Sequence, residues 1–120
     1  MDSPDNEEIR RYLTMDDDEL YRLLVPEGEP NLFNDPHARV TRGKEIFVAS
    51  FRRVQVGVCK EYRAHKDRIG NAIDMTALVA SVVMAAPVPY GLPVIPFAVI
   101  VVKTGMAELC SGQGASTGAT

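Results

Sequence analysis

Residues 69–110, IGNAIDMTALVASVVMAAPVPYGLPVIPFAVIVVKTGMAELC, form the most apolar part of the chain. Between Asp74 and Lys103 lie 28 consecutive residues without a charge, and four prolines interrupt this run. Because proline ends or kinks a helix, we predict a helical hairpin with one arm over about 69–86 and another over about 96–110. Both arms are apolar nearly all round, and such helices are buried either in protein or in lipid.

The length of the hairpin favours lipid. Two transmembrane helices need ~40 residues, and 69–110 offers 42. Asp74 and Lys103 both lie toward the open end, and a basic segment precedes it, which matches entry from the cytoplasmic side. We therefore expect a membrane location on the cytoplasmic side. The alternative is a cytoplasmic protein whose hairpin is buried in a homo- or hetero-oligomer, since few other residues could cover it.

Small residues form a stripe on each arm. Ala77, Ser81 and Ala85 recur every four residues on the first arm. Ala98 and Gly105 lie seven residues apart on the second. Small side chains let two helices approach closely, in membranes and in soluble cores alike. We predict that the two stripes face each other, and we assign all five residues to a hairpin in the membrane or against a partner.

A basic segment, 37–68, precedes the hairpin and carries nine bases against three acids. Asp35-Pro36 is typical of a helix start, so we predict one long amphipathic helix over about 36–66. Its apolar face has the register Val40, Phe47, Phe51, Val54, Val58 and Tyr62. The alternation over 54–59 is typical of a strand, which leaves that alternative open. The predicted basic surface comprises Arg39, Arg42, Arg52, Arg53, Lys60, Arg63, Lys66 and Arg68.

Residues 1–36 form an acidic arm with 11 acids against three bases. We predict two short helices there, over about 4–13 and 15–25, followed by a loop at 26–36 that Pro and Gly punctuate. Thr14 and Asp17 have the spacing of a capping box, so we expect Thr14 to be the N-cap of the second helix. The last residues, 111–120, are rich in Gly, Ser, Thr and Ala, and we expect a disordered tail.

The basic surface could be a solvated side of the helix that pairs with the acidic arm, or it could bind anionic lipid headgroups or nucleic-acid phosphates. Nucleic acid is disfavoured, because a protein that reads it normally adds aromatic or amide side chains to the basic face. Here Phe47, Phe51 and Tyr62 lie on the apolar face instead. We therefore expect a protein partner or self-association, with an anionic membrane surface as a further partner.

No motif in the sequence indicates catalysis, a metal or a cofactor. His37 and His65 are 28 residues apart, and neither has a metal ligand at the required spacing. Cys59 and His65 do not share a helix face, and Gly43 lacks the flanking residues of a phosphate-binding loop. Two cysteines are too few for a disulfide scaffold, and the acidic N-terminus is unlike a secretory signal. We therefore expect reduced, buried thiols.

The sequence thus predicts an all-α protein with short acidic N-terminal helices, one long basic amphipathic helix and a C-terminal apolar helical hairpin. We expect a small non-enzymatic protein that associates with the membrane through its hairpin, as transmembrane helices, and presents its charged N-terminal region to a protein partner. The alternative is a soluble accessory subunit whose apolar hairpin is buried in an oligomer. No catalytic residue, metal ligand or cofactor is assigned.

Overall fold

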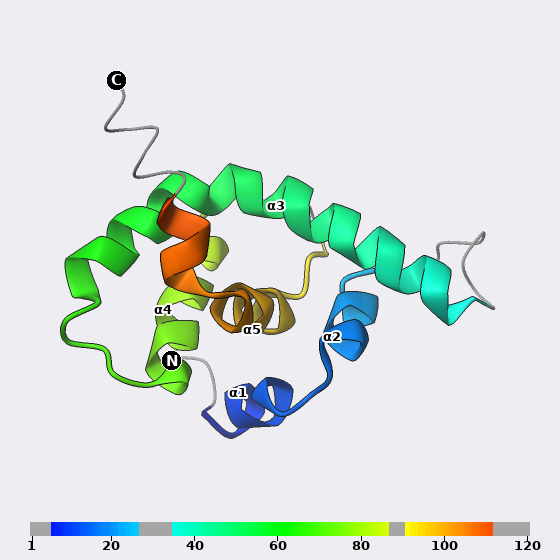
Figure 1. Ribbon diagram of the computed structural model, residues 1–120, viewed down its shortest axis with the longest axis horizontal. Helices are drawn as coiled ribbons and strands as arrows, with labels where there is room; N and C mark the ends of the chain where they lie inside the picture. The colour runs from blue at the N-terminus through cyan, green and yellow to red at the C-terminus, as the bar shows by residue number, and fades with distance from the viewer. Residues whose placement is uncertain (1–5, 27–34, 87–90, 112–120) are drawn as a thin grey trace.

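The computed structural model describes residues 6–26, 35–86 and 91–111, which hold helices and turns but no strand (Figure 1). The labelled helices are α1 (Asn6–Leu13), α2 (Asp17–Leu23), α3 (Pro36–His65), α4 (Ala72–Ala85) and α5 (Val94–Thr104). A short helical segment over 106–111 follows α5. The predicted all-α class is confirmed, and the strand alternative for 54–59 is wrong, because these residues lie inside α3. Residues 27–34 of the expected loop and 112–120 of the expected disordered tail lie outside the described residues.

Helix α5 lies in the middle of the molecule, with α1, α2 and α4 packed against it and α3 extending across the bundle (Figure 1). Its residues Phe97 to Val101 are each at most 3% exposed. A helix that is apolar all round has no side that favours water, so neighbours must cover every side. The second arm of the predicted hairpin therefore lies at the centre of the hydrophobic core.

The described helices do not have the dimensions of membrane spans. α4 has 14 residues and α5 has 11. At about 1.5 Å per residue both fall well short of a ~30 Å hydrocarbon core. Within the described ranges, no helix combines the length and the apolarity needed to cross a membrane. The prediction of transmembrane arms is therefore unsupported, because it counted all of 69–110 as available to the two helices.

The two arms of the predicted hairpin do pack against each other as α4 and α5. Asn71 caps α4 by accepting a hydrogen bond from the backbone N–H of Asp74 at 2.8 Å. Gly105 ends α5 with a φ of 115°, a conformation that glycine adopts without a steric cost. The second arm is thus shorter than predicted, since the chain turns at Gly105 into the segment 106–111.

The contact between α4 and α5 uses a different side of α4 from the one we predicted. Ala77 is half-buried, but Ser81 and Ala85 are exposed. The buried residues of α4 are instead Met75, Thr76, Val79, Ala80 and Val83. On the second arm Ala98 is fully buried, whereas Gly105 serves as the C-terminal cap of α5. The prediction that this stripe faces the second arm is wrong, because the sequence of a helix that is apolar on all sides does not indicate which side packs.

Helix α3 has the apolar register that the sequence predicts. The Asp35 carboxylate caps it by accepting hydrogen bonds from the backbone N–H groups of His37 and Ala38, at 3.1 and 3.2 Å. The predicted residues are buried except Tyr62, which is half-buried. The full buried set is Val40, Gly43, Phe47, Ser50, Phe51, Val54, Val58 and Cys59. The start of α3 and its inner side were therefore readable from local pattern.

Aromatic rings join α2, α3 and α5 at one point. The ring centroid of Phe47 lies 5.3 Å from that of Phe97 and 6.1 Å from that of Tyr21. Gly43, one turn before Phe47, sits directly against the backbone of Tyr21, where a Cβ atom would overlap the carbonyl group. The missing side chain lets α2 and α3 approach closely enough for the rings to meet.

The turn between α1 and α2 differs from the predicted one. The hydroxyl of Thr14 donates to a backbone carbonyl in the last turn of α1 at 2.8 Å, and α2 begins at Asp17 with Asp16 as its N-cap. Thr14 is therefore wrong as the N-cap, because it completes the helix before it. Lys103, at the end of α5, donates to the Met15 carbonyl oxygen at 2.6 Å and pairs with the Asp17 carboxylate at 3.0 Å. This cation ties the turn to α5.

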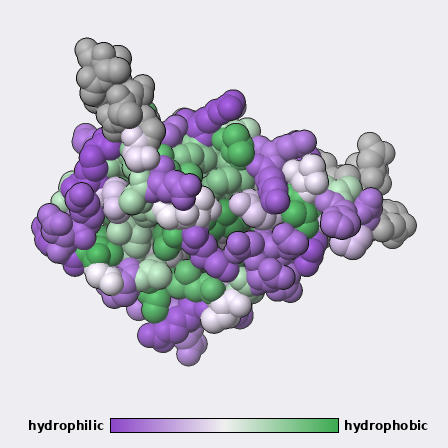
Figure 2. Space-filling view, in the orientation of Figure 1, coloured by the Kyte–Doolittle hydropathy of each residue, from purple (hydrophilic) through white to green (hydrophobic). Residues whose placement is uncertain are grey.

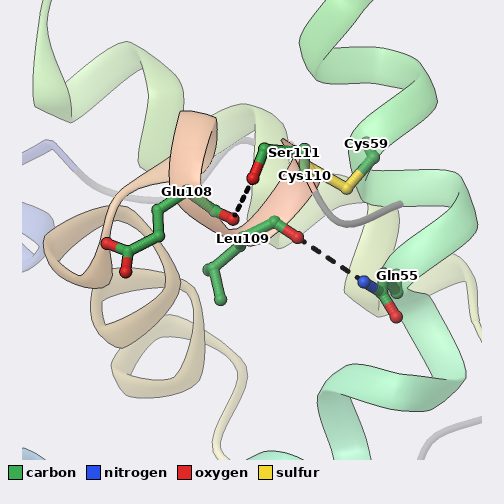
Figure 3. The surroundings of a disulfide bond; sticks show 6 residues. All are labelled: Gln55, Cys59, Glu108, Leu109, Cys110 and Ser111. Atoms are coloured by element: carbon green, nitrogen blue, oxygen red, sulfur yellow. Dashed lines mark hydrogen bonds between the residues drawn. A yellow bond between two sulfur atoms is a disulfide. The ribbon is translucent and has the colours of Figure 1, made fainter. Parts of the chain in front are cut away.

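A disulfide joins Cys59 of α3 to Cys110, with the two Cα atoms 5.5 Å apart (Figure 3). Both cysteines are buried as expected, but the expectation of reduced thiols is wrong. The two residues are 51 positions apart, so no local pattern indicates that they meet. Next to the bond, the side-chain amide of Gln55 donates to the Leu109 carbonyl oxygen at 3.5 Å (Figure 3). Both contacts hold the segment 106–111 on α3.

We expect replacement of Cys59 and Cys110 by alanine to lower the free energy of unfolding by about 4 kcal/mol, because the bond closes a long loop in the unfolded chain. Urea denaturation followed by circular dichroism measures the difference. A reductant should move the wild-type transition toward that of the double variant and leave the variant unchanged. Two free thiols in the native oxidised protein, detected by mass spectrometry, would contradict the disulfide.

We expect Gly43→Ala to lower the free energy of unfolding by about 1–3 kcal/mol, because the added methyl group forces α2 away from α3. Gly70→Ala is the matched control: the space around Gly70 is open, so its effect should stay within about 0.5 kcal/mol. Urea midpoints of the two variants provide the comparison. Equal midpoints would show that α2 and α3 do not approach closely at Gly43.

Candidate functional site

Helix α3 leaves one side of its length in contact with solvent. We define the outer face of α3 as six exposed residues: Glu45, Val48, Arg52, Val56, Lys60 and Arg63. Val48 is 48% exposed and Val56 is 66% exposed, although valine is among the residues most often found inside proteins. Figure 2 shows that apolar groups also reach the surface in patches between hydrophilic residues. The outer face thus mixes aliphatic side chains with cations.

Several of the predicted basic residues serve the fold of the chain itself. The Arg39 guanidinium donates to the Val25 carbonyl oxygen at 3.4 Å, which holds the end of α2 near α3. Arg42 pairs with Glu45 at 3.3 Å. Arg68 donates to a backbone carbonyl in the last turn of α3 at 3.2 Å. These cations are half-buried or locally engaged, so they are less available to a partner.

The other predicted cations lie along the second half of α3. Arg53 also has an interaction partner. Within the described part of the chain, no hydrogen bond or ion pair engages the side chains of Arg52, Lys60, Arg63 or Lys66, and all four residues are exposed. The described residues of the acidic arm form no ion pair with these four side chains. Their combined positive field is therefore directed into solvent, where it attracts anionic groups.

A shallow hollow between α3 and α4 brings two of the predicted residue sets together. Its volume is about 450 Å³, and Gly57 and Lys60 of α3 line it together with Ser81 and Ala85 of α4. The small side chains of the stripe leave this space open instead of filling a helix contact. Ser81 and Ala85 are thus surface residues at the edge of the outer face. Their assignment to a partner interface stays a prediction.

Tyr21, in the described part of the chain, has a clearly raised side-chain pKa. Burial raises the pKa of its hydroxyl, the nearby carboxylates of Asp17 and Asp18 raise the pKa further, and a hydrogen bond with the Thr104 side chain lowers it. Because Tyr21 lies in the contact between α2 and α3, we regard it as a packing residue. The described ranges contain no group of three or more His, Cys, Asp or Glu residues that could hold a metal ion.

Sequence reasoning missed the two exposed valines of the outer face. Val54, Val56 and Val58 looked like one alternating set, which is why a strand was considered. On a helix, however, Val56 follows Val54 by about 200° and must point to the opposite side. The helical register, applied to every residue of 54–59, contained the signal for an exposed valine.

Comparison with known proteins does not add a precedent for this surface. The sequence matches no protein-family model, no curated protein and no solved structure. The interpretation of the outer face therefore rests on its own chemistry, which is that of exposed aliphatic groups beside cations.

Proposed function

We propose that the protein is a non-enzymatic accessory subunit that docks through the outer face of α3 onto an acidic, partly apolar surface of a protein partner. The observation that carries this proposal is Val56, 66% exposed, one turn from each of the exposed cations Arg52 and Lys60. Apolar contact at the centre of an interface provides affinity, and surrounding charges steer and orient the partner. Arginine also matches the geometry of carboxylates.

The docking surface in this proposal is α3 and not the hairpin. Our sequence-based alternative placed the apolar hairpin in an oligomer interface, which assumed that its surface was uncovered. Phe97 to Val101 are already enclosed by the helices of the chain. A partner would therefore meet the outer face of α3 and, beside it, the hollow lined by Ser81 and Ala85.

An anionic membrane surface is the rival ligand for these cations. A helix that lies on a membrane needs bulky apolar side chains on the side that enters the lipid. The phenylalanines of α3, Phe47 and Phe51, belong to the core instead, and the half-buried Tyr62 packs against that core. Valines are the only large apolar residues of the outer face, so a protein surface fits it better than lipid.

The disulfide bears on where the partner would be met. Disulfides form and persist mainly in oxidising compartments and are rare in the reducing cytoplasm. The Cys59–Cys110 bond therefore favours an oxidising setting over the cytoplasmic side that we expected from the sequence.

Photo-crosslinking from position 56 tests the docking proposal. With a photoreactive amino acid in place of Val56, we expect one protein adduct in cells of the source organism, identified by mass spectrometry. The affinity of the purified partner should then fall at least about tenfold in Lys60→Glu/Arg63→Glu, because reversed charges repel an acidic surface.

Arg10→Glu/Arg11→Glu provides the matched control, since it makes the same change in net charge in the last turn of α1. This control should alter the affinity by less than about twofold. Absence of any protein adduct from position 56 would overturn the proposal. Flotation of the protein with phosphatidylserine vesicles, if Lys60→Glu/Arg63→Glu abolishes it, would overturn it in favour of a membrane surface.

A further inference from the structure

A second hollow lies nearer the start of α3, beside the end of α2 and the residues that lead into α5. Its volume is about 490 Å³, within the range of pockets for small molecules. Leu24, Ile46, Ala49 and Leu92 provide apolar walls, and Arg42 and Glu45 also line it. Because Arg42 and Glu45 form an ion pair at 3.3 Å and both are well exposed, they form a polar rim that is close to neutral.

Ser50 is a buried polar residue of this hollow. It is one of the lining residues, it is 0% exposed, and its hydroxyl has no hydrogen-bond partner within the described part of the chain. An unsatisfied buried hydroxyl destabilises a fold, and nearly all such groups have a partner. Serine in a helix can bond to the carbonyl oxygen one turn back, but Ser50 does not do so here. Its hydroxyl therefore keeps an unused capacity both to donate and to accept a hydrogen bond.

We propose that this hollow is a binding site for a small neutral molecule with an apolar body and one hydrogen-bonding group, such as an alkylphenol. The apolar walls match the body, and the Ser50 hydroxyl pairs with the hydrogen-bonding group. A charged ligand would gain little, because Glu45 already compensates the charge of Arg42. The site shares only Glu45 with the outer face of α3, and Glu45 carries neither proposal, so either proposal can fail without the other.

Titration with 4-propylphenol and with propylbenzene tests the role of the hydroxyl pairing. The two probes share one apolar body and differ in one hydroxyl group. Chemical-shift changes of the backbone amides of Ala49, Ser50 and Leu92 report binding at the hollow. We expect the wild-type protein to bind the phenol about tenfold more tightly than the hydrocarbon, as one added hydrogen bond predicts.

Ser50→Ala should remove this preference, so that both probes bind with equal affinity. The variant should fold normally, because it deletes a hydroxyl that has no partner in the described residues. Equal affinity of the two probes for the wild-type protein, or a preference for the phenol that survives Ser50→Ala, would overturn the assignment of Ser50. Absence of binding by either probe would overturn the site itself.

A filled hollow gives a second, independent test. Ala49 and Ala64 are both exposed alanines of α3, but only Ala49 lines this hollow. Ala49→Phe should weaken both probes at least about tenfold by occupying their space, whereas Ala64→Phe should leave both affinities within about twofold of wild type. Unchanged affinity in Ala49→Phe would place the ligand elsewhere and refute the proposal, even if Ser50→Ala could not be purified.

Discussion

A helix without a polar side has to be enclosed, and the enclosure of α5 determines how the rest of the molecule is arranged. Helices α1 and α2 have eight and seven residues, lengths at which isolated helices are not stable in water. Each nevertheless contributes a fully buried side chain, Ile9 from α1 and Leu20 from α2. The burial of these side chains, together with the contacts of both helices with α5, stabilises short elements that could not form alone. The longest helix, α3, completes the cover through Phe47.

The parts of the fold that the sequence predicts are those encoded by local pattern. Asp35 and Pro36 mark the start of α3, and a strong apolar period identifies its inner side. Prolines between the arms of the hairpin indicate that the long apolar run forms two helices and not one. The packing side of α4 was not predictable, because most sides of that helix are apolar and only its contacts with the other helices determine that Val79 and Val83 are buried. Thr14 failed for a related reason, since one residue can end a helix or begin the next.

In the candidate site, too, local pattern predicts some features and only the folded chain reveals the others. Charge alone predicts that most bases of α3 are exposed, but only the folded chain reveals that Arg39 bonds to the end of α2 while Arg52 and Lys60 face solvent. The walls of the hollow at Ser50 come from three segments that are far apart in sequence. No motif with a fixed spacing can therefore indicate such a site in the sequence. The pairing of two cysteines 51 positions apart is hidden in the same way.

The disulfide also divides the chain into a covalent ring and an open end. The ring runs from Cys59 to Cys110 and contains α4 and α5, whereas α1 and α2 lie outside it. A single backbone cut within the ring would leave its two pieces joined. The acidic arm has no such link, and packing on α3 and α5 and the Lys103 contacts hold it in place. Its separation from the bundle would therefore expose α5 to water while the disulfide ring stayed intact.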